Sequence, residues 1–431
     1  MAATPSTTSP AAADALAFLR ELVAAQPDGE AAVQGRIAAR LAASGCALRT
    51  LDYDPGAVPV VGEFAADEAR APERRSAVVG TLAGDAARRS LLLFAHPDAE
   101  PVAGTERWTR APFAGETDGG RMYGWGIADD LAGCAAAVLA TERAARSGRA
   151  LGDVLVASTP SKRHARGVAA VLHEGLDADA SLYLHPAESG VGMREIKALA
   201  SGQLEFVVTV AGRPPETSEP GHTAFSHLAV NPVDKAFVVH AALVALGEAR
   251  AARVRHPRLQ AAIGRSTNLQ VSSVRCGEMG KLSRLQPSCE LGGAVSFPPG
   301  ETYAAVMAEI EACLERCARA DEWLAEHPPT LRWLSGVTGA EVAEEHPLYA
   351  TAAAAVRRVT GERPFVNALH TSSDIRNPAV EKGIPTVGLG CLGGDLSQNG
   401  RRDEWVDVPD FLRMVDVTTA VVLDWCGAAR A

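Results

Sequence analysis

The sequence predicts an α/β protein in which helices cover a parallel sheet and a second unit interrupts the chain. Apolar runs typical of buried strands alternate with helical patterns over residues 1–199, and the same alternation returns over 339–431. Between them, residues 200–338 change to half-buried strands and helices in the order βαββαβ. We therefore expect one split α/β domain that carries an inserted domain.

The first part of the chain contains helices and strands in regular alternation. Residues between Ala12 and Ala25 have the spacing of a helix, and the later run SLLLFAHPD is typical of a buried strand. The next predicted elements are a helix over Asp129–Gly148, a strand over Asp153–Thr159, a helix over Val168–Gly175 and a strand in ASLYLHP. This order indicates a parallel sheet covered by helices.

The inserted unit and the last part of the chain follow. The predicted strands and helices of the insertion are QLEFVVTVAG, NPVDKAFVVHAALVAL, STNLQVSSVRCG, CELGGAVSFPPG, TYAAVMAEIEACLERC and TLRWLSG, of which the second and fifth are helices. From about Glu341 the α/β pattern returns, with a helix through Ala353, a buried strand in GIPTVGLG and a closing helix over Val408–Trp425.

Composition excludes several classes of protein. The chain has 431 residues, of which 47% are hydrophobic, and this is ample material for a large core. A formal net charge of -10 leaves no basic stripe, so we expect no nucleic-acid partner. The N-terminal residues have neither a basic region nor an unbroken apolar stretch, which predicts a cytoplasmic protein with no membrane contact. Eight cysteines without a C-x-x-C pair indicate reduced thiols.

Candidate site residues begin at the end of the SLLLFA strand. His96 and Asp98 lie two positions apart, so both side chains point to the same side, where one can bind a metal and the other can support it. Taken alone, the pair fits equally a histidine that is hydrogen-bonded to a neighbouring carboxylate. Further along, Asp129 is expected at the start of a helix, where the helix dipole stabilises a carboxylate.

Several spaced motifs together resemble one enzyme family. HPD, then W-x-x-x-PF, then DG-x-x-YG-x-G-x-x-D resemble the co-catalytic zinc peptidases that include glutamate carboxypeptidase G, aminoacylase and succinyl-diaminopimelate desuccinylase. The similarity continues through GLDAD, GHTAF with NPV, SSD, GIPTVGLG and DEWVDV. The resemblance implies a zinc-peptidase-like catalytic domain with a mixed sheet covered by helices, over 1–199 and 339–431. It also implies that 200–338 form a βαββαβ lid and dimerisation domain, and hence a homodimer.

The resemblance also implies roles for individual residues. His96 would bind the first metal, Asp98 would support it and Asp129 would bridge two zinc ions. His185, in LHPAES, stands where the family has an acidic ligand, and imidazole binds zinc well. Alternatively, His185 only forms hydrogen bonds in a metal-free cleft. His96, Asp129 and His185 would together hold at most one zinc ion.

Other positions depart from the family pattern. The family has a Glu-Glu pair where this chain has TPSKRHARG, which puts Ser161 at the general base and Lys162 at a ligand of the second metal. A shift of one residue would put Lys162 and Arg163 there instead. The last histidine ligand falls on Asn399 or Gly400, neither of which normally binds zinc. The ammonium of Lys162 would then take the place of the second zinc ion.

Further residues are candidates for binding the substrate from the inserted domain or for replacing the missing general base. His222, in PGHTAF, resembles a lid histidine that stabilises the oxyanion in a neighbouring subunit, and Asn268 resembles a lid asparagine that holds substrate; loop capping and strand-edge bonding are the alternatives. Ser296 stands where a lid arginine would hold a substrate carboxylate. Candidates for the missing base are Glu188, Asp130, Glu100 and His370, and His370 is also a candidate substrate contact.

Three functional hypotheses agree with these residues. The first is a metal-dependent amidohydrolase or peptidase that acts on an N-acyl amino acid or small peptide with at most one zinc ion, and His185 favours it. The second is a non-hydrolytic, metal-independent enzyme of amide formation, cyclisation, acyl transfer or rearrangement that uses Lys162. The third is a non-catalytic relative in which a salt bridge between Lys162 and Asp129 closes the site. We adopt the first.

Overall fold

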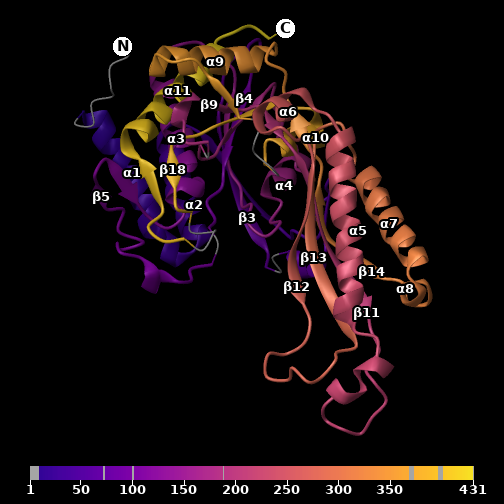
Figure 1. Ribbon diagram of the computed structural model, residues 1–431. Coiled ribbons are helices and arrows are strands. Elements are labelled where there is room, and N and C mark those ends of the chain that lie inside the picture. The colour runs from indigo at the N-terminus through magenta and orange to yellow at the C-terminus, as the bar shows by residue number, and fades with distance from the viewer. Residues whose placement is uncertain are drawn as a thin grey trace.

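Two sheets organise the protein. The computed structural model describes residues 9–70, 73–99, 101–187, 189–367, 373–396 and 401–430 (Figure 1). One sheet has eight strands and the other has five. Figure 1 shows the five-stranded sheet and its helices as an arm that extends from the part that holds the larger sheet.

The helices and strands have the following bounds. The α-helices are α1 (Pro10–Ala25), α2 (Glu30–Ala43), α3 (Ala132–Arg146), α4 (Gly167–His173), α5 (Pro232–Arg253), α6 (Pro257–Ile263), α7 (Tyr303–Ala320), α8 (Glu322–Glu326), α9 (Pro347–Thr360), α10 (Arg376–Lys382) and α11 (Val408–Cys426). The strands are β1 (Ala47–Tyr53), β2 (Glu63–Ala65), β3 (Arg75–Leu82), β4 (Leu91–Ala95), β5 (Thr117–Asp118), β6 (Arg121–Tyr123), β7 (Val154–Ser158), β8 (Ser181–Leu184), β9 (Glu195–Lys197), β10 (Leu199–Ala200), β11 (Gly202–Ala211), β12 (Asn268–Arg275), β13 (Ser288–Phe297), β14 (Thr330–Val337), β15 (Ala340–Glu341), β16 (Phe365–Asn367), β17 (Thr386–Leu389), β18 (Gly393–Gly394) and β19 (Trp405–Asp407). Within the described ranges, no helix is long and apolar enough to cross a bilayer.

The large sheet confirms the predicted α/β class. Its strand order is β1-β3-β7-β4-β8-β17-β9-β16, with β7, β4, β8 and β17 parallel in the centre and β1 and β3 antiparallel at one side. The sheet is therefore mixed rather than purely parallel. Leu91 and Leu93 of β4 pack in the core that contains α1, α3 and α11, whereas Leu92 and Phe94 pack in the core that contains α4. Burial on both faces explains the unbroken apolar run.

The smaller sheet forms the arm, with the order β12-β13-β11-β14-β2. Its elements follow the predicted order, β11, α5, β12, β13, α7 and β14, with the short helices α6 and α8 in addition. Residues of α5 and α7 pack against one face of the sheet. Strand β2 comes from residues 63–65 and pairs with β14, so the arm also uses a strand from the first part of the chain.

The structure corrects the expected helix start at Asp129. Helix α3 begins at Ala132, and residues 127–131 form a π-type turn in which Asp129 and Asp130 have non-helical dihedral angles. The carboxylate of Glu404 holds this turn, because it accepts hydrogen bonds from the backbone of Gly126, Ala128 and Asp129 at 3.0, 2.8 and 3.3 Å. Asp129 therefore owes its position to Glu404 rather than to the first turn of a helix.

Helix α3 lies against the end of β8 because Gly133 has no side chain. A Cβ atom at Gly133 would overlap the carbonyl oxygen of Leu184 and would press on the side chain of Ala95. Leu184 is the last residue of β8 and directly precedes His185. This close contact therefore sets the spacing between the turn that carries Asp129 and the end of β8.

We predict that Gly133→Ala lowers the free energy of unfolding by about 1–3 kcal/mol, because the added methyl group forces apart a packed helix and strand. Gly35 is the matched control, since it also lies within a helix but has no atom near its missing Cβ. Gly35→Ala should raise stability by about 0.5–1 kcal/mol. Urea denaturation measures both values, and an equal effect at the two positions would contradict this role for Gly133.

Candidate functional site

Three neighbouring strands bring predicted site residues to one edge of the large sheet. His96 follows β4, Ser161 and Lys162 follow β7, and His185 follows β8. Strands β7, β4 and β8 are adjacent and parallel, so their carboxyl ends meet at the same edge. Contacts of Lys162 and His185 with Asp129 bring the turn before α3 to this edge as well.

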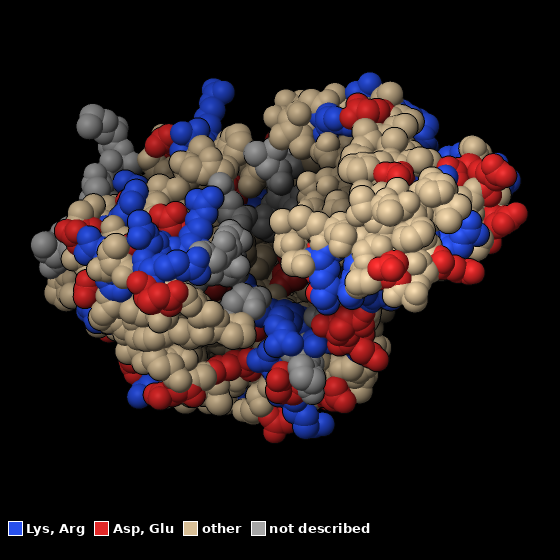
Figure 2. All heavy atoms as spheres, turned by 60° about the horizontal axis from the view of Figure 1, so that its bottom comes forward, with Lys and Arg blue, Asp and Glu red and all other residues tan. Residues whose placement is uncertain are grey.

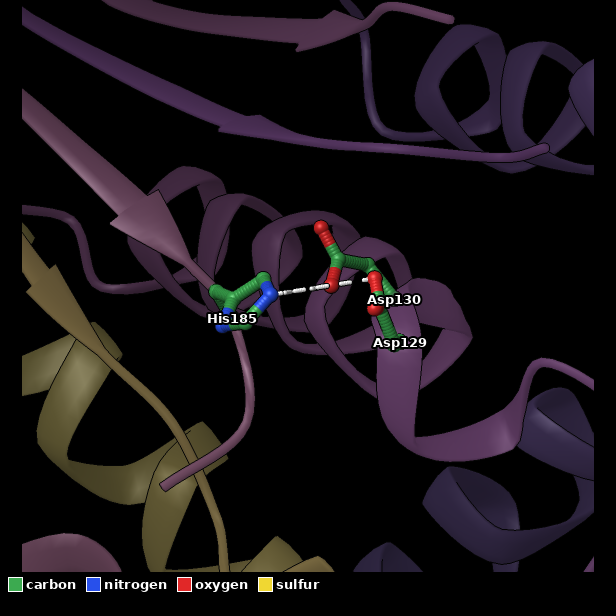
Figure 3. A group of neighbouring side chains, drawn as sticks. All are labelled: Asp129, Asp130 and His185. Atoms are coloured by element: carbon green, nitrogen blue, oxygen red, sulfur yellow. Dashed lines mark ion pairs between the residues drawn. The ribbon is translucent and has the colours of Figure 1, made fainter. Parts of the chain in front are cut away.

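Asp129, Asp130 and His185 form a compact, buried group (Figure 3). Nε2 of His185 lies 3.8 Å from Oδ1 of Asp129 and 3.9 Å from Oδ1 of Asp130. One potential ligand atom from each of the three residues lies within 4.8 Å of the others. The group contains two of the three predicted metal ligands, Asp129 and His185, and adds Asp130.

Lys162 places an ammonium directly on this group. Its Nζ donates to Oδ1 of Asp129 at 2.8 Å, and both side chains are largely buried. Burial alone would lower the pKa of Lys162, but the contact with Asp129 and the nearby carboxylates of Asp130 and Asp98 together outweigh burial and raise that pKa. Burial would likewise raise the pKa of Asp129, and the charges of Lys162 and His185 hold it well below its usual range. Both groups are therefore charged at neutral pH.

The carboxylate of Asp98 holds the loop that positions Lys162. It accepts hydrogen bonds from the backbone nitrogens of Ser161, at 3.0 Å, and of Lys162, at 2.9 Å. The next residues include three with positive φ, namely Arg163, His164 and Arg166, at 54–56°. L-residues seldom adopt this conformation, so surrounding contacts must stabilise the loop. Asp98, predicted to support His96, contributes such contacts to the loop.

His96 contacts a carboxylate that the sequence analysis did not single out. Nε2 of His96 lies 2.8 Å from Oδ2 of Asp374, and Nδ1 lies 2.6 Å from the carbonyl oxygen of Thr159. Ser161 Oγ donates to the same oxygen of Asp374 at 2.8 Å. Burial lowers the pKa of His96, but the contact with Asp374 outweighs it and raises that pKa. The only sequence signal for Asp374 was its place in the SSD motif.

Asp130 is the most deeply buried residue of the three. Among the described residues, neither of its carboxyl oxygens has a hydrogen-bond partner, and both are fully buried. Burial, followed by the charge of Asp129, raises the pKa of Asp130 well above its usual range. Oδ2 of Asp130 also lies 3.9 Å from Nε2 of His96. Asp130 is therefore a buried carboxyl group, facing two imidazoles, that a cation could bind.

A second buried lysine fixes the backbone at His185. Lys197 is fully buried and donates to the carbonyl oxygens of His185, at 3.1 Å, and of Pro186. Its charge is balanced by Glu195, 2.9 Å away, which is 1% exposed. The sequence analysis missed this pair because Glu195 and Lys197 lie in an ordinary short strand, β9.

The predicted lid residues lie on the arm. Nδ1 of His222 accepts a hydrogen bond from the backbone nitrogen of Leu285 at 3.1 Å, so in this chain the ring caps a loop. Asn268 starts β12 and pairs in register with Ser296 of β13. The remaining candidates lie outside the described residues, namely Glu100, Glu188, His370, Asn399 and Gly400. The roles predicted for His222 and Asn268 stay predictions.

Known proteins share this fold and its sequence pattern. The sequence model of peptidase family M20/M25/M40 matches residues 92–424. The structure is similar to an M20 family metallo-carboxypeptidase from Sulfolobus solfataricus, with a TM-score of 0.70 and 14% identity over 96% of this chain and 99% of that one. A tripeptidase from Staphylococcus aureus gives a TM-score of 0.68, with 14% identity over 96% and 98% of the two chains. The dipeptidase Dug1p from Saccharomyces cerevisiae gives 0.67, with 13% identity over 97% of both chains.

The raised pKa of His96 predicts how its contribution to stability depends on pH. A histidine whose folded pKa lies above its unfolded value of 6.5 stabilises the fold fully below pH 6.5, and this contribution is lost as the pH rises through the folded pKa. With chelator present, the difference in free energy of unfolding between the wild type and His96→Asn should therefore shrink as the pH rises above 6.5. A difference that grows with pH would contradict the ion pair with Asp374.

Proposed function

We propose that this chain, which belongs to peptidase family M20/M25/M40, hydrolyses amide bonds in N-acyl amino acids or small peptides with one divalent metal ion. Family membership gives the coarser class, a metal-dependent hydrolase of peptides or amides. The proposal adds the number of metal ions and the kind of substrate. In it, the ammonium of Lys162 takes the place of a second metal ion.

The observation that carries this proposal is the contact between Lys162 and Asp129 beside a group that still offers metal ligands. The contact alone also fits the non-catalytic hypothesis, and the ligand group favours the metal-dependent one. A carboxylate that bridges two metal ions has a cation on each of its two sides. In this chain Nζ of Lys162 lies 2.8 Å from Oδ1 of Asp129, and Nε2 of His185 lies 3.8 Å from the same oxygen, so Asp129 already has one cation as a partner. A fixed positive charge beside Asp129 supplies part of the electrostatic effect of a metal ion, and unlike a metal ion it cannot dissociate into solution.

The remaining donors suit one zinc ion. Asp129, Asp130 and His185 offer two carboxylates and an imidazole, and catalytic zinc sites commonly have three protein ligands and one open position. Ligand atoms on one tetrahedral zinc ion lie about 3.4 Å apart, close to the separations of 3.8 and 3.9 Å from Nε2 of His185. The buried carboxyl of Asp130, which lacks a hydrogen-bond partner among the described residues, would become a ligand. Bound zinc would polarise a carbonyl group and lower the pKa of a water molecule.

The side chains around the donors have separate tasks. Lys162 would donate to the carbonyl oxygen as negative charge develops there, because its ammonium is fixed in a site with little water. Ser161 donates to Asp374 and is not a base. Asp374 is the carboxylate nearest to Ser161, but the contact with His96 lowers its pKa, which makes it a weak proton acceptor. Hydrolysis should therefore be slow compared with enzymes that carry a glutamate base.

One observation favours a second candidate function. The charges of Lys162 and Asp129 balance each other, and His96 has Asp374 as a partner at 2.8 Å. These charged groups of the site therefore have partners without a metal ion. A metal-independent enzyme that forms or rearranges an amide bond would use Lys162 to stabilise the same oxyanion, and it would tolerate the absence of a strong base.

The test of the proposed function is a zinc titration of chelator-stripped protein with a panel of dipeptides and N-acyl amino acids. We expect amide hydrolysis to be absent without metal and to saturate at about one zinc ion per chain. Hydrolysis that is unchanged by stripping would contradict the proposal, and saturation at two ions would contradict the role of Lys162.

In Lys162→Glu, bound zinc should rise toward two ions, whereas Lys162→Met removes the charge without adding a ligand and should leave bound zinc near one ion per chain.

We also propose that the chain forms a homodimer through the arm. Helix α5 exposes Phe237, Val238 and Val244 by 65, 41 and 47%, and the neighbouring edge strand β12 exposes Val274 by 62%. Exposed apolar side chains next to an unpaired strand edge favour association with a second copy.

In sedimentation velocity we expect a dimer for the wild type and a monomer for Phe237→Glu, because burying the new carboxylate costs several kcal/mol. The control Val102→Glu adds the same charge at an apolar side chain that is 48% exposed outside the arm, and it should stay dimeric. A monomeric wild type would contradict the proposal.

A further inference from the structure

The open face of the smaller sheet carries two rows of polar side chains near the catalytic edge. Directly paired residues of antiparallel strands lie on the same face. One row contains Asn268, Ser296, Gln203, Val337 and Glu63, and the next contains Gln270, Ala294, Glu205, Ser335 and Ala65. The intervening residues Leu204 and Phe206 pack with α5 and α7, so the two rows face away from these helices. Neither row contains a lysine or an arginine.

One cavity joins this face to the loop that carries Lys162. Its volume is about 200 Å³, and its walls are His164 on one side and the sheet residues Gln203, Glu205, Ser335, Gly336 and Val337 on the other. The Cα atom of His164 is two residues from that of Lys162, which places them within about 7.6 Å of each other. Ligand pockets usually exceed about 300 Å³, so this cavity suits one side chain of a substrate rather than a whole molecule.

The two carboxylates in these rows, Glu63 and Glu205, have different kinds of partner. Glu63 is compensated by Arg166 at 3.2 Å and by Arg376 at 3.3 Å. Glu205, which lines the cavity, has no ion-pair partner among the described residues. Its oxygens accept only from neutral donors, Gln203 Nε2 at 3.2 Å and Ser335 Oγ at 3.1 Å. Each oxygen keeps a further lone pair for a donor from a ligand.

We propose that this cavity is a specificity pocket for a positively charged group of the substrate. Glu205 binds an ammonium or guanidinium group, and Gln203 and Ser335 hold the carboxylate in place. The inference rests on the proposed function and names its substrate class, namely amides of amino acids or peptides with a cationic side chain. Acidic side chains are disfavoured because, among the described residues, Glu205 is the one carboxylate that lines the cavity and no lysine or arginine lines it, while His164 lies 3.6 Å from Glu63.

The test compares the binding of N-acetyl-L-lysine and N-acetyl-L-norleucine by isothermal titration calorimetry, with chelator present so that no hydrolysis occurs. The two probes differ by the ammonium group. We expect the wild type to bind the lysine derivative about tenfold more tightly, because hydrogen bonds to charged groups are the strong ones. Glu205→Gln should make the two affinities equal, and Glu205→Asp, which keeps the charge, should retain a preference for the lysine derivative.

Glu290→Gln is the matched control. Glu290 lies on β13 with its side chain on the same open face, four residues from Ala294, and its neighbour Arg275 is 3.7 Å away. This variant should keep the full preference for the lysine derivative. Equal affinities in the wild type, or a preference that survives Glu205→Gln, would overturn the proposal. Binding is measured without turnover, so the two proposals fail separately. A failed hydrolysis assay does not affect the measured preference for the lysine derivative, and the lack of such a preference does not affect the zinc-dependent hydrolysis.

Discussion

The ion pair between Lys162 and Asp129 is the interaction on which the rest of the site depends. A buried ammonium or carboxylate is costly unless it has a partner at hydrogen-bond distance, so neither residue could hold its place alone. Lys162 reaches Asp129 because Asp98 holds the backbone at Lys162 through hydrogen bonds. Asp129 is held from the other side by the turn that Glu404 stabilises. Burial and the negative charge of Asp129 also raise the pKa of the neighbouring Asp130.

Under the proposed function, this arrangement builds one cation of the catalytic centre into the polypeptide. An ammonium group cannot dissociate from the site, and it cannot polarise a bound water molecule as a metal ion does. It nevertheless keeps a positive charge beside Asp129. Asp130 and His185, together with Asp129, still offer ligand atoms for one metal ion. His96, at the neighbouring strand end, has Asp374 as its partner at 2.8 Å. In the proposed function the fold of the M20/M25/M40 family remains, while a side chain takes over the role of one metal ion.

Sequence patterns predicted the parts of the site that lie at strand ends. Apolar runs located β4, β7 and β8, the family resemblance singled out His96, Lys162 and His185, and the structure shows that these residues meet at one edge of the sheet. The patterns could not reveal Asp374, because its contact with His96 joins segments that are distant in the chain and follow no periodicity. They also missed the turn before α3, since its shape depends on Glu404 rather than on local helix propensity. Strand β2 escaped prediction because three residues carry too little pattern.

The most direct test of the account is the location of metal in crystals of the zinc-loaded protein, by anomalous diffraction at the zinc absorption edge. We predict a single peak per chain, bounded by Asp129, Asp130 and His185, with Nζ of Lys162 still in contact with Asp129. Two peaks that flank Asp129 with Lys162 displaced would contradict the claim that the ammonium replaces a metal ion. The absence of any peak at this group would contradict the metal-dependent function and favour the metal-independent one.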